Sequence, residues 1–505
     1  MTASPVLLIN PRIGLRRNAR IPLSLLHLAA VLEGKRRWRI LDGNFEADLV
    51  AKAVAAVRSE PHALVGVTVM PGPQVATAIE VSKAIRKAAP EVPIVWGGYF
   101  PTLYPAAALN ASYVDVLVRG QGEQPLLDLL ELLDRASLDA SALDGVRGIS
   151  WKRGELPVHN ADAPFVDPRS LPSLPYTGLG DVGRFMPPSF LGERTAVHQG
   201  AIGCRYRCSF CGVASMFNGS TILDAPARVL AAGRELRDVW GADSLQFFDH
   251  NFFDREDNSL PMLEALTELG LPWWCYARAD TLAGFSHATW VKLRRSHARM
   301  LYIGAESATD AALAEIKKGS RVEHTVETVQ RCREHGIIPE LSFMIGGTDD
   351  PEGEVEPTFR FIRELKAIHP AAEVVLYFYS PTPQRKRGPR VDGAVRLPVL
   401  GTYGPSGPAL PSTPEEWTEP HWVKWVCHND APWLTERTRQ RIRDFSRVLA
   451  CRFPTAQDPN RKRLGRSVLR TMARWRYATQ TYDSPWELAA AERLVRLREP
   501  KSESL

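Results

Sequence analysis

The chain has 505 residues, 44% of them hydrophobic and 24% charged, which indicates a soluble globular protein of two or three domains. The net charge of +6 is modest for this length, and the basic stretch from 437 to 476 also carries acidic and aromatic residues, so a solvated helical face is favoured over a nucleic-acid surface. No apolar run could span a bilayer and no signal-peptide pattern precedes the first strand, so we expect no membrane span and a cytoplasmic location.

The first 145 residues alternate strand-like and helix-like segments. Short apolar strands that are bounded by turn residues and joined by helices predict an α/β domain with a doubly wound, Rossmann-like parallel sheet. Strands are expected at 6–9, 39–41, 63–69, 93–96 and 114–118, with helices at 21–33, 48–58 and 74–88.

The carboxyl ends of these strands carry residues suited to a ligand. Ligands of such sheets bind beyond the carboxyl ends of the strands, and glycines there let a bulky ligand approach the backbone. A turn explains any single glycine equally well, but their recurrence at one edge favours binding. No G-x-G-x-x-G follows the first strand, so a dinucleotide is not expected. The candidate residues are Asn10, Pro11, Thr68, Gly97, Gly98, Tyr99, Gly120, Gly122 and Glu123.

Residues 146–190 are expected to connect two domains, as a hairpin over 146–158 followed by a proline-rich linker without a helix. From 191 to 385 six strands are expected, with helices between them, at 196–202, 244–248, 273–276, 300–303, 338–345 and 374–379. This series predicts a partial (β/α)6 barrel of the TIM type, with its chemistry at the carboxyl ends of the strands. Residues 386–505 predict a mainly helical C-terminal domain.

Three of the seven cysteines are clustered, as Cys204, Cys208 and Cys211, which indicates metal ligation in a reducing compartment and not a disulfide framework. Three thiolates at this spacing can hold three irons of a [4Fe–4S] cluster and leave the fourth iron open. A structural zinc site needs a fourth ligand at short spacing, which neither His198 nor His250 offers. The remaining alternative is a trio of buried free thiols.

The cysteine motif, with Phe210 before its last cysteine, resembles that of the radical S-adenosylmethionine (SAM) superfamily. The later strands resemble the cobalamin-associated branch of that family, at Phe247–Phe252, Tyr276–Asp280, Gly304–Ser307, Lys317–Gly319 and Met344–Gly347. The N-terminal part resembles the cobalamin-binding domain of the same branch, at Asn10–Pro11, Ile21–Pro22, Gly97–Thr102 and Arg119–Glu123.

This resemblance implies an enzyme similar to the class B methyltransferases, with a [4Fe–4S] cluster, SAM and cobalamin as cofactors. The three cysteines would hold the cluster, and the nine edge residues named above would contact cobalamin. The D-x-H-x-x-G motif that places a histidine under cobalt in many B12 proteins is absent here, as is common in this branch. The lower axial cobalt ligand is therefore unassigned, with Met70 and a water both open.

The resemblance also implies the residues that contact SAM. Asp249 and Asn251 would accept hydrogen bonds from its amino group or ribose, with a loop cap as the alternative. Arg278 and Glu306 would contact its carboxylate and ribose hydroxyls, with a structural ion pair as the alternative. Phe210 is equally consistent with plain core. Gly346 would give adenine access to the backbone, or simply allow a turn.

The reaction common in this branch is methylation of an unactivated carbon, in which one SAM supplies the methyl to cobalamin and a second SAM supplies the radical. The alternative is redox or ring-forming chemistry, as in the anaerobic magnesium-protoporphyrin ester cyclase. An electron donor such as flavodoxin or ferredoxin is implied in both cases. We expect a small-molecule substrate on a secondary-metabolite scaffold, as in antibiotic biosynthesis, with Trp273, Trp274 and Tyr276 able to pack a planar group or simply to form core.

Overall fold

The computed structural model describes residues 3–14, 18–135, 138–217, 219–347, 349–383, 410–457 and 463–495. The chain forms two compact units, and each unit draws on several stretches of the sequence. The N-terminal unit comprises Met1–Pro187, Ala201–Arg228 and Pro381–Cys427, and the barrel unit comprises Pro188–Gly200, Val229–Ser380 and His428–Leu505. The predicted domain boundary between residues 385 and 386 lies outside the described residues, and the linear boundaries stay predictions.

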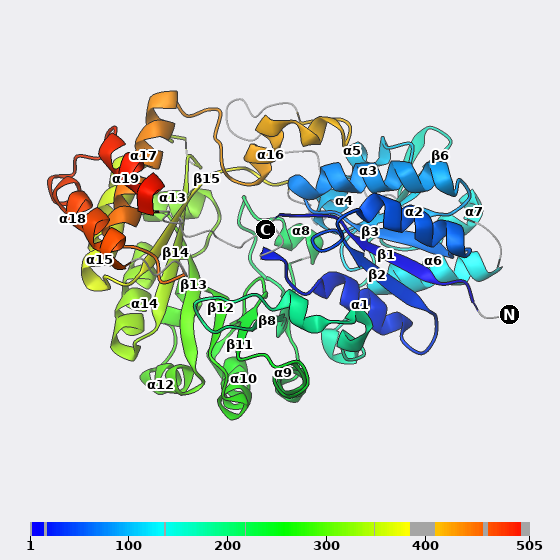
Figure 1. The fold of residues 1–505 in the computed structure, drawn as a ribbon, viewed down its shortest axis with the longest axis horizontal. Coiled ribbons are helices and arrows are strands. Elements are labelled where there is room, and N and C mark those ends of the chain that lie inside the picture. Colours follow the sequence, from blue (N-terminus) through cyan, green and yellow to red (C-terminus); the bar gives the residue numbers. More distant parts are fainter. Residues whose placement is uncertain are drawn as a thin grey trace. The chain divides into compact units, whose positions relative to one another are not determined.

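The N-terminal unit is built on a seven-stranded sheet with the order β2-β1-β3-β4-β5-β6-β7 (Figure 1). The strands are β1 Val6–Asn10, β2 Trp38–Asp42, β3 Leu64–Thr68, β4 Ile94–Gly97, β5 Val116–Val118, β6 Ile149–Arg153 and β7 Leu156–His159. The first five strands pair in parallel, which confirms the predicted doubly wound domain. The order reverses between β1 and β3, and a ligand is expected at such a switch point.

Helices cover both faces of this sheet because each helix has one apolar stripe to bury. Helices α1 (Leu23–Leu32) and α6 (Glu123–Arg135) share one face, where Leu25, Leu129 and Leu130 pack with Leu8 of β1. Helices α2 (Leu49–Ser59) and α3 (Pro73–Ala88) lie together on the other face (Figure 1).

The predicted hairpin forms β6 and β7, and its first strand pairs antiparallel with β5. The hairpin therefore extends the N-terminal sheet, a role that its local sequence did not indicate. The following proline-rich stretch contains three short 3₁₀ turns, η2 (Pro168–Ser170), η3 (Tyr176–Leu179) and η4 (Val182–Phe185), and no α-helix, as predicted.

The barrel unit contains a six-stranded parallel sheet with the order β15-β14-β13-β12-β11-β8. Its strands are β8 Thr195–His198, β11 Ser244–Phe247, β12 Trp273–Arg278, β13 Ala298–Glu306, β14 Ile338–Ile345 and β15 Glu373–Phe378. The intervening helices are α9 Pro226–Asp238, α10 Glu256–Leu269, α11 Ala279–Ala283, α12 His287–Arg295, α13 Asp310–Glu315, α14 Val322–His335 and α15 Val355–Ile368. The predicted partial (β/α)6 barrel is confirmed.

One predicted strand was wrong in its extent. The expected first barrel strand, 196–202, is two strands, of which only β8 belongs to the six-stranded sheet. The second, β9 (Ala201–Gly203), pairs antiparallel with β10 (Thr221–Leu223). Gln199 and Gly200 separate the two apolar runs, and a glycine in a strand interior favours such a break. The cysteine motif therefore lies in the connection between β9 and β10.

The C-terminal region is helical, as predicted. It contains η5 (Glu416–Thr418), α16 (Pro420–Val426), α17 (Glu436–Arg452), α18 (Arg463–Thr479) and α19 (Trp486–Val495). Phe445 of α17 stacks on Phe359 of α15, with 3.8 Å between ring centroids, so α17 is anchored to the barrel unit by aromatic packing. Among the described helices, none is both long and apolar enough to cross a membrane.

Candidate functional site

Polar side chains hold the carboxyl end of β1 in a fixed shape. Asn10 Nδ2 donates to Asp42 Oδ2 over 2.9 Å, and Gln74 Nε2 donates to Asn10 Oδ1 and to the Pro11 carbonyl over 3.0 and 2.8 Å. Burial raises the pKa of Asp42, while its hydrogen bonds from Asn10 and Asn44 lower it. The predicted Asn10 and Pro11 are thus tied to β2 and to α3, and Gln74, which the sequence reading did not single out, joins them.

Glycines shape the same edge at β4 and β5. Gly98 has a φ of +97°, and a Cβ there would lie 3.0 Å from the Val69 carbonyl oxygen and 3.1 Å from Thr68 Oγ1. Gly120 has a φ of +78°, and its N–H donates to Thr102 Oγ1 over 3.0 Å. Thr102 Oγ1 in turn donates to the Gly98 carbonyl over 2.7 Å. Thr102 therefore joins the predicted Gly98 and Gly120, and the predicted Thr68 lies beside Gly98.

The remaining predicted edge residues lie close to these. Gly97 ends β4, and a Cβ on Gly122 would lie 3.1 Å from Leu28 of α1. Glu123 begins α6 and is buried, and burial raises its pKa. Its Oε2 has no hydrogen-bond partner among the described residues. Burial of this kind disfavours the charged carboxylate.

The cysteine loop connects β9 to α8 (Val213–Met216) and is fastened on both sides. The Arg205 N–H donates to Thr221 Oγ1 of β10 over 2.8 Å. The Thr382 N–H and hydroxyl donate to the carbonyls of Ser209 and Phe210 over 3.1 and 2.8 Å. The Cys211 N–H donates to the Cys208 carbonyl over 3.1 Å, which closes a turn between these two ligands.

Helix α4 (Tyr99–Leu103) packs against this loop through α8. A Cβ on Gly212 would lie 2.9 Å from Leu103 Cδ1 and 3.3 Å from Tyr99 Cδ1, so only glycine fits there without displacement. Burial raises the pKa of Tyr99 well above its ordinary value, and the thiols of Cys211 and Cys204 raise it further. Tyr99, predicted as a cobalamin contact, thus lies beside two of the predicted cluster ligands.

These residues fit the cofactors that the resemblance implies. Cys204, Cys208 and Cys211 lie on one fastened loop, and none of them is in a disulfide. Three soft thiolates suit iron of an iron–sulfur cluster. At the sheet edge, Gly98 and Gly120 have positive φ and a Cβ there would meet backbone carbonyl oxygens, so these turns require glycine at the end of the sheet where such folds bind ligands.

The carboxyl ends of the barrel strands carry buried polar groups. Asp249 and Asn251 follow β11 and are 2% and 1% exposed. Asn251 Nδ2 donates to the Phe253 carbonyl over 2.7 Å, which is the predicted loop cap. Its Oδ1 has no partner among the described residues, and this acceptor is left for a ligand. His250, between them, has its pKa lowered by burial to about 4, so it is neutral near pH 7.

Arg278 and Glu306 lie in ion pairs at the ends of β12 and β13. Arg278 Nε donates to Asp280 Oδ1 over 2.9 Å, and its Nη2 donates to the Lys318 carbonyl. Lys318 Nζ donates to Glu306 Oε1 over 2.8 Å, and Ser342 Oγ donates to Glu306 Oε2 over 3.2 Å. Lys318 therefore connects the two predicted residues.

Glu306 also has an unusual backbone. Its φ is +63°, and the ladder between β13 and β14 shifts register between Gly304 and Glu306. Such strain in a residue other than glycine costs about 1–3 kcal/mol and is commonly found at functional sites. A Cβ on Gly304 would lie 2.2 Å from Glu306 Oε1, so Gly304 is required for this carboxylate position.

Gly346 is held on both sides of its backbone. Its N–H donates to Glu354 Oε2 over 2.9 Å, and Trp433 Nε1 donates to its carbonyl over 2.8 Å. Its φ is +94°, which supports the turn alternative. Trp433 was not singled out by sequence, since it lies far from Gly346 along the chain.

Aromatic residues on β12 divide between the two faces of the barrel sheet. Trp273 packs into the core with Phe247 and donates from Nε1 to the Ser296 carbonyl, so it is a core residue. Trp274 and Tyr276 point to the other face, where Tyr276 and Tyr302 of β13 lie with ring centroids 5.0 Å apart. Trp274 is itself buried against Tyr276 and Tyr302, so of the three predicted aromatics only Tyr276 is partly exposed.

The amino-terminal end of the barrel sheet is closed by the C-terminal segment. Gln457 Nε2 donates to Glu340 Oε1 over 2.7 Å, and Thr455 Oγ1 donates to Glu373 Oε2 over 2.6 Å. Both buried carboxylates therefore accept hydrogen bonds from the C-terminal segment. The chemistry of the barrel is expected at the opposite end, beyond the carboxyl ends of the strands.

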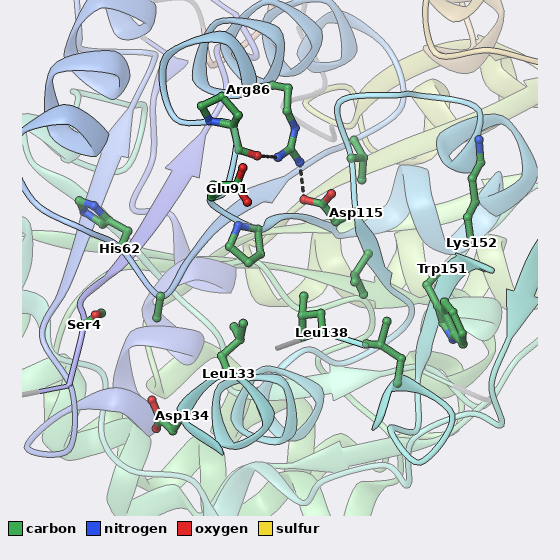
Figure 2. Close-up of a pocket in the computed structure, with 16 residues that line it drawn as sticks. Ser4, His62, Arg86, Glu91, Asp115, Leu133, Asp134, Leu138, Trp151 and Lys152 are labelled. Atoms are coloured by element: carbon green, nitrogen blue, oxygen red, sulfur yellow. Dashed lines mark hydrogen bonds and ion pairs between the residues drawn. The ribbon is translucent and has the colours of Figure 1, made fainter. Parts of the chain in front are cut away.

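A hollow of about 710 Å³ lies in the N-terminal unit, but at the opposite end of the sheet (Figure 2). Its lining includes Ala63, Pro93 and Val114, which precede β3, β4 and β5. Arg86 spans it and donates to the Pro90 carbonyl and to the Asp115 carboxylate (Figure 2). Ligands of doubly wound sheets bind beyond the carboxyl ends, so this hollow is not the candidate site.

Two protein families match the chain. Residues 16–130 match the B12 binding domain, and residues 201–362 match the radical SAM superfamily. The first range contains seven of the nine predicted edge residues, from Thr68 to Glu123, and the second contains the three cysteines. The matches confirm the predicted pairing of domains and, with it, cobalamin, SAM and a [4Fe–4S] cluster as the cofactors.

Individual proteins show the same relationship at low identity. The chain is 24% identical to an uncharacterized methyltransferase, PH0819, of Pyrococcus horikoshii, covering 68% of this chain and 73% of that one. It is 23% identical to the anaerobic magnesium-protoporphyrin IX monomethyl ester cyclase of Rubrivivax gelatinosus, covering 57% of this chain and about half, 51%, of the cyclase.

A solved structure has the same fold. The radical SAM methyltransferase TsrM of Kitasatospora setae, solved with cobalamin and a [4Fe–4S] cluster bound, superposes with a TM-score of 0.64 at 18% identity, covering 98% of this chain and 99% of that one. The chain therefore combines a stretch that matches the B12 binding domain with a stretch that matches the radical SAM superfamily, in a fold that TsrM shares.

Proposed function

We propose that this protein is a cobalamin-dependent radical SAM C-methyltransferase, which moves a methyl group from SAM through cobalamin to an unactivated carbon of a small molecule. Residues 1–145 bind cobalamin, residues 191–385 form the SAM-cleaving barrel, and 146–190 and 386–505 connect and complete them. One observation carries the proposal. Helix α4 starts at the cobalamin edge of the N-terminal sheet and packs on the cysteine loop, so both binding regions belong to one compact unit.

The residues of the chain have distinct roles in this reaction. Cobalamin, when bound, supplies the methyl carrier, and the cluster with SAM supplies the radical. Cys204, Cys208 and Cys211 hold the cluster. Gly98 and Gly120 form the tight turns of the sheet edge that would face cobalamin, and the hydrogen bonds of Asn10 hold the end of β1 beside them.

The barrel edge orients SAM. Arg278 binds its carboxylate, while Glu306 and the free Oδ1 of Asn251 accept hydrogen bonds from its ribose and ammonium group. Asp249, a buried acid next to Asn251, adds negative charge for the ammonium. Fixed, largely desolvated charges of this kind need little rearrangement when the ligand binds.

The substrate and the electron source follow from the reaction class. Tyr276 and Tyr302, on the face away from the helices, suit a planar group on a secondary-metabolite scaffold. The electron for the cluster comes from a small redox protein such as flavodoxin or ferredoxin.

The test uses full-length protein reconstituted with iron, sulfide and cobalamin, then given CD3-labelled SAM, a reductant and a metabolite extract. Methyl transfer predicts S-adenosylhomocysteine, 5′-deoxyadenosine and a CD3-labelled product together. Arg278→Gln, which keeps a polar side chain and loses the charge, should weaken SAM binding in equilibrium dialysis. Thr309→Ala, which removes the cap of α13 away from the pair, should not.

The cyclase is the second candidate, because the chain also matches that protein over 57% of its length. If 5′-deoxyadenosine accumulates while no S-adenosylhomocysteine forms and no product carries the label, the reaction is cyclisation or oxidation and methyl transfer is wrong.

A further inference from the structure

The face of the barrel sheet that turns away from the helices carries a group of aromatic side chains. The Tyr276 ring lies between those of Trp274 and Tyr302, with 5.0 Å between ring centroids on each side. The Tyr302 hydroxyl donates to the Tyr377 hydroxyl of β15 over 3.3 Å. Trp274 is 5% exposed, whereas the three tyrosines are only half-buried although they lie within strands of the sheet. A small molecule can therefore reach the tyrosine rings.

Two buried hydrogen-bond donors lie on the same face of the sheet. Gln246 of β11 and Trp274 of β12 are Cα partners on neighbouring parallel strands, so their side chains leave the sheet on the same side. Gln246 is 3% exposed. Neither Gln246 Nε2 nor Trp274 Nε1 has a hydrogen-bond partner among the described residues. Both nitrogens carry hydrogen and can only donate, so the partner that this pair requires is an acceptor atom.

A buried donor without a partner is costly to the fold. The folded chain has removed the group from water and made no hydrogen bond in return. Native proteins keep few such groups, and two of them at one register position require an explanation. A ligand whose acceptor atom reaches both donors satisfies them when it binds. An analogue that lacks the acceptor leaves them unsatisfied, so such a site discriminates strongly between the two compounds.

The groups nearby favour a neutral acceptor over an anion. Gln457 Nε2 contacts both Met300 Sδ, over 3.7 Å, and Glu340 Oε1, over 2.7 Å. Met300 is the Cα partner of Trp274, and Glu340 is the Cα partner of Tyr302. The carboxyl group of Glu340 is 1% exposed, and a buried carboxyl disfavours a second negative group beside it. A ketone or amide oxygen accepts hydrogen bonds without adding a charge.

We propose that this face of the barrel binds the planar part of the substrate against Tyr276 and Tyr302, and that Gln246 and Trp274 donate hydrogen bonds to a neutral carbonyl oxygen on it. The two donors are then specificity-determining residues, which select planar aromatic carbonyl compounds. This inference rests on the proposed function, which requires a small-molecule substrate. It adds a means of selecting that substrate which neither cofactor provides.

The experiment is equilibrium dialysis of the full-length protein, reconstituted with iron, sulfide and cobalamin, against two planar probes of similar size. The first probe, 2-acetylnaphthalene, has a neutral carbonyl, and the second, 2-ethylnaphthalene, has none. The parent protein should bind the ketone about tenfold more tightly, because two donors gain a partner. Gln246→Met, which removes the amide, should weaken ketone binding by about threefold to tenfold, as expected for one hydrogen bond, and leave binding of 2-ethylnaphthalene unchanged.

A second variant and a stability measurement separate recognition from a role in folding. Trp274→Phe removes the other donor and should also lower the preference for the ketone. Replacing an unsatisfied donor by an apolar group should leave the midpoint of thermal unfolding of Gln246→Met at or above that of the parent. The matched control is Trp290→Phe in α12, since Trp290 Nε1 is likewise buried without a partner among the described residues. This variant should keep the parental preference.

Several results would overturn the inference. They are equal binding of the two probes to the parent, no binding of either probe, an unchanged preference in both donor variants, and an equal loss in Trp290→Phe. An unchanged preference in the donor variants would mean that a bound water satisfies the two donors. Failure of the proposed function looks different, because probe binding requires no turnover: labelled SAM would yield no S-adenosylhomocysteine while the parent still preferred the ketone.

Discussion

The carboxyl edges of the two sheets are built from different chemistry. In the N-terminal unit the edge consists of glycines, the amides of Asn10 and Gln74, the Thr102 hydroxyl and the buried Arg119, whose partner Asp162 is 39% exposed. In the barrel unit the corresponding edge carries two ion pairs, Arg278–Asp280 and Lys318–Glu306, and both members of each pair are largely buried. The folds are related in architecture, but among these residues only the barrel edge buries both members of an ion pair.

The difference matches the two ligands. Cobalamin is large, and backbone groups and shape can recognise it where side chains are kept away. SAM carries an ammonium, a carboxylate and a sulfonium within a few bonds, so a fixed set of charges can orient it. Buried ion pairs add little to stability relative to apolar packing, which supports a functional reason for those in the barrel unit.

The largest expected effect concerns the cysteine loop, which stands apart from both edges. Cys208→Ala should abolish the visible charge-transfer absorbance of the cluster and all formation of 5′-deoxyadenosine, because the loop loses one of its three thiolates. Cys332→Ala, which removes a buried free thiol of α14, is the control and should keep both. A Cys208→Ala protein with normal absorbance and activity would refute the ligand assignment.

The next prediction tests whether the barrel edge depends on its charges. Lys318→Met leaves Glu306 buried without its cation and should lower the free energy of unfolding by about 3–5 kcal/mol. Urea unfolding followed by circular dichroism measures this. The neighbouring Lys317 is exposed, and Lys317→Met should change stability by less than about 0.5 kcal/mol. If the two substitutions lower the free energy of unfolding equally, the buried ion pair of Lys318 is not important for the barrel edge, and the contrast with the N-terminal sheet is wrong.

A third prediction concerns pH and the N-terminal unit. Burial, assisted by the Arg228 charge, lowers the pKa of His27 from 6.5 to about 4. Between these values the unfolded chain binds a proton that the folded chain does not, so stability falls as the pH falls from about 6.5 to about 4, by about 2–3 kcal/mol from this residue.

His27→Phe should remove this part of the acid sensitivity, since neither ring nitrogen has a hydrogen-bond partner among the described residues. Thermal unfolding at several pH values measures it. His421→Phe, at an exposed position, should keep the parental pH dependence. If His27→Phe loses as much stability on acidification as the parent, the buried neutral histidine is not its source.

The smallest effect is expected at the glycines of the N-terminal sheet edge. Gly98→Ala puts a Cβ 3.0 Å from the Val69 carbonyl at a φ of +97° and should cost about 1–3 kcal/mol. Cobalamin binding, measured by absorbance titration, should weaken about tenfold or more, because the edge must shift. Gly154→Ala also has a positive φ but meets nothing within 4 Å, so its cobalamin affinity should be parental. Parental affinity in both would show that the Gly98 edge does not contact cobalamin.

The sequence by itself determined the two α/β sheets, the helical C-terminus and the cysteine motif. These rest on signals that lie within short stretches: apolar strands between turn residues, and three thiols within eight positions. The strand that was predicted too long, 196–202, shows the limit of such signals. Its two apolar runs are close enough in the sequence to predict one strand. In the structure the second run, β9, pairs with β10 and is a separate strand.

Only the tertiary structure decided which residues meet. Lys318 joins Arg278 to Glu306, Thr102 joins Gly98 to Gly120, and Tyr99 reaches the cysteine loop. Apart from the contact between Thr102 and Gly98, four residues apart on α4, these contacts join residues far apart in the sequence, and they depend on the order of the strands and on which loop packs against which helix. Local sequence patterns were enough to predict the helices, the strands and the three cysteines. The charged and polar partners of the site residues depend on packing between segments that lie far apart in the chain.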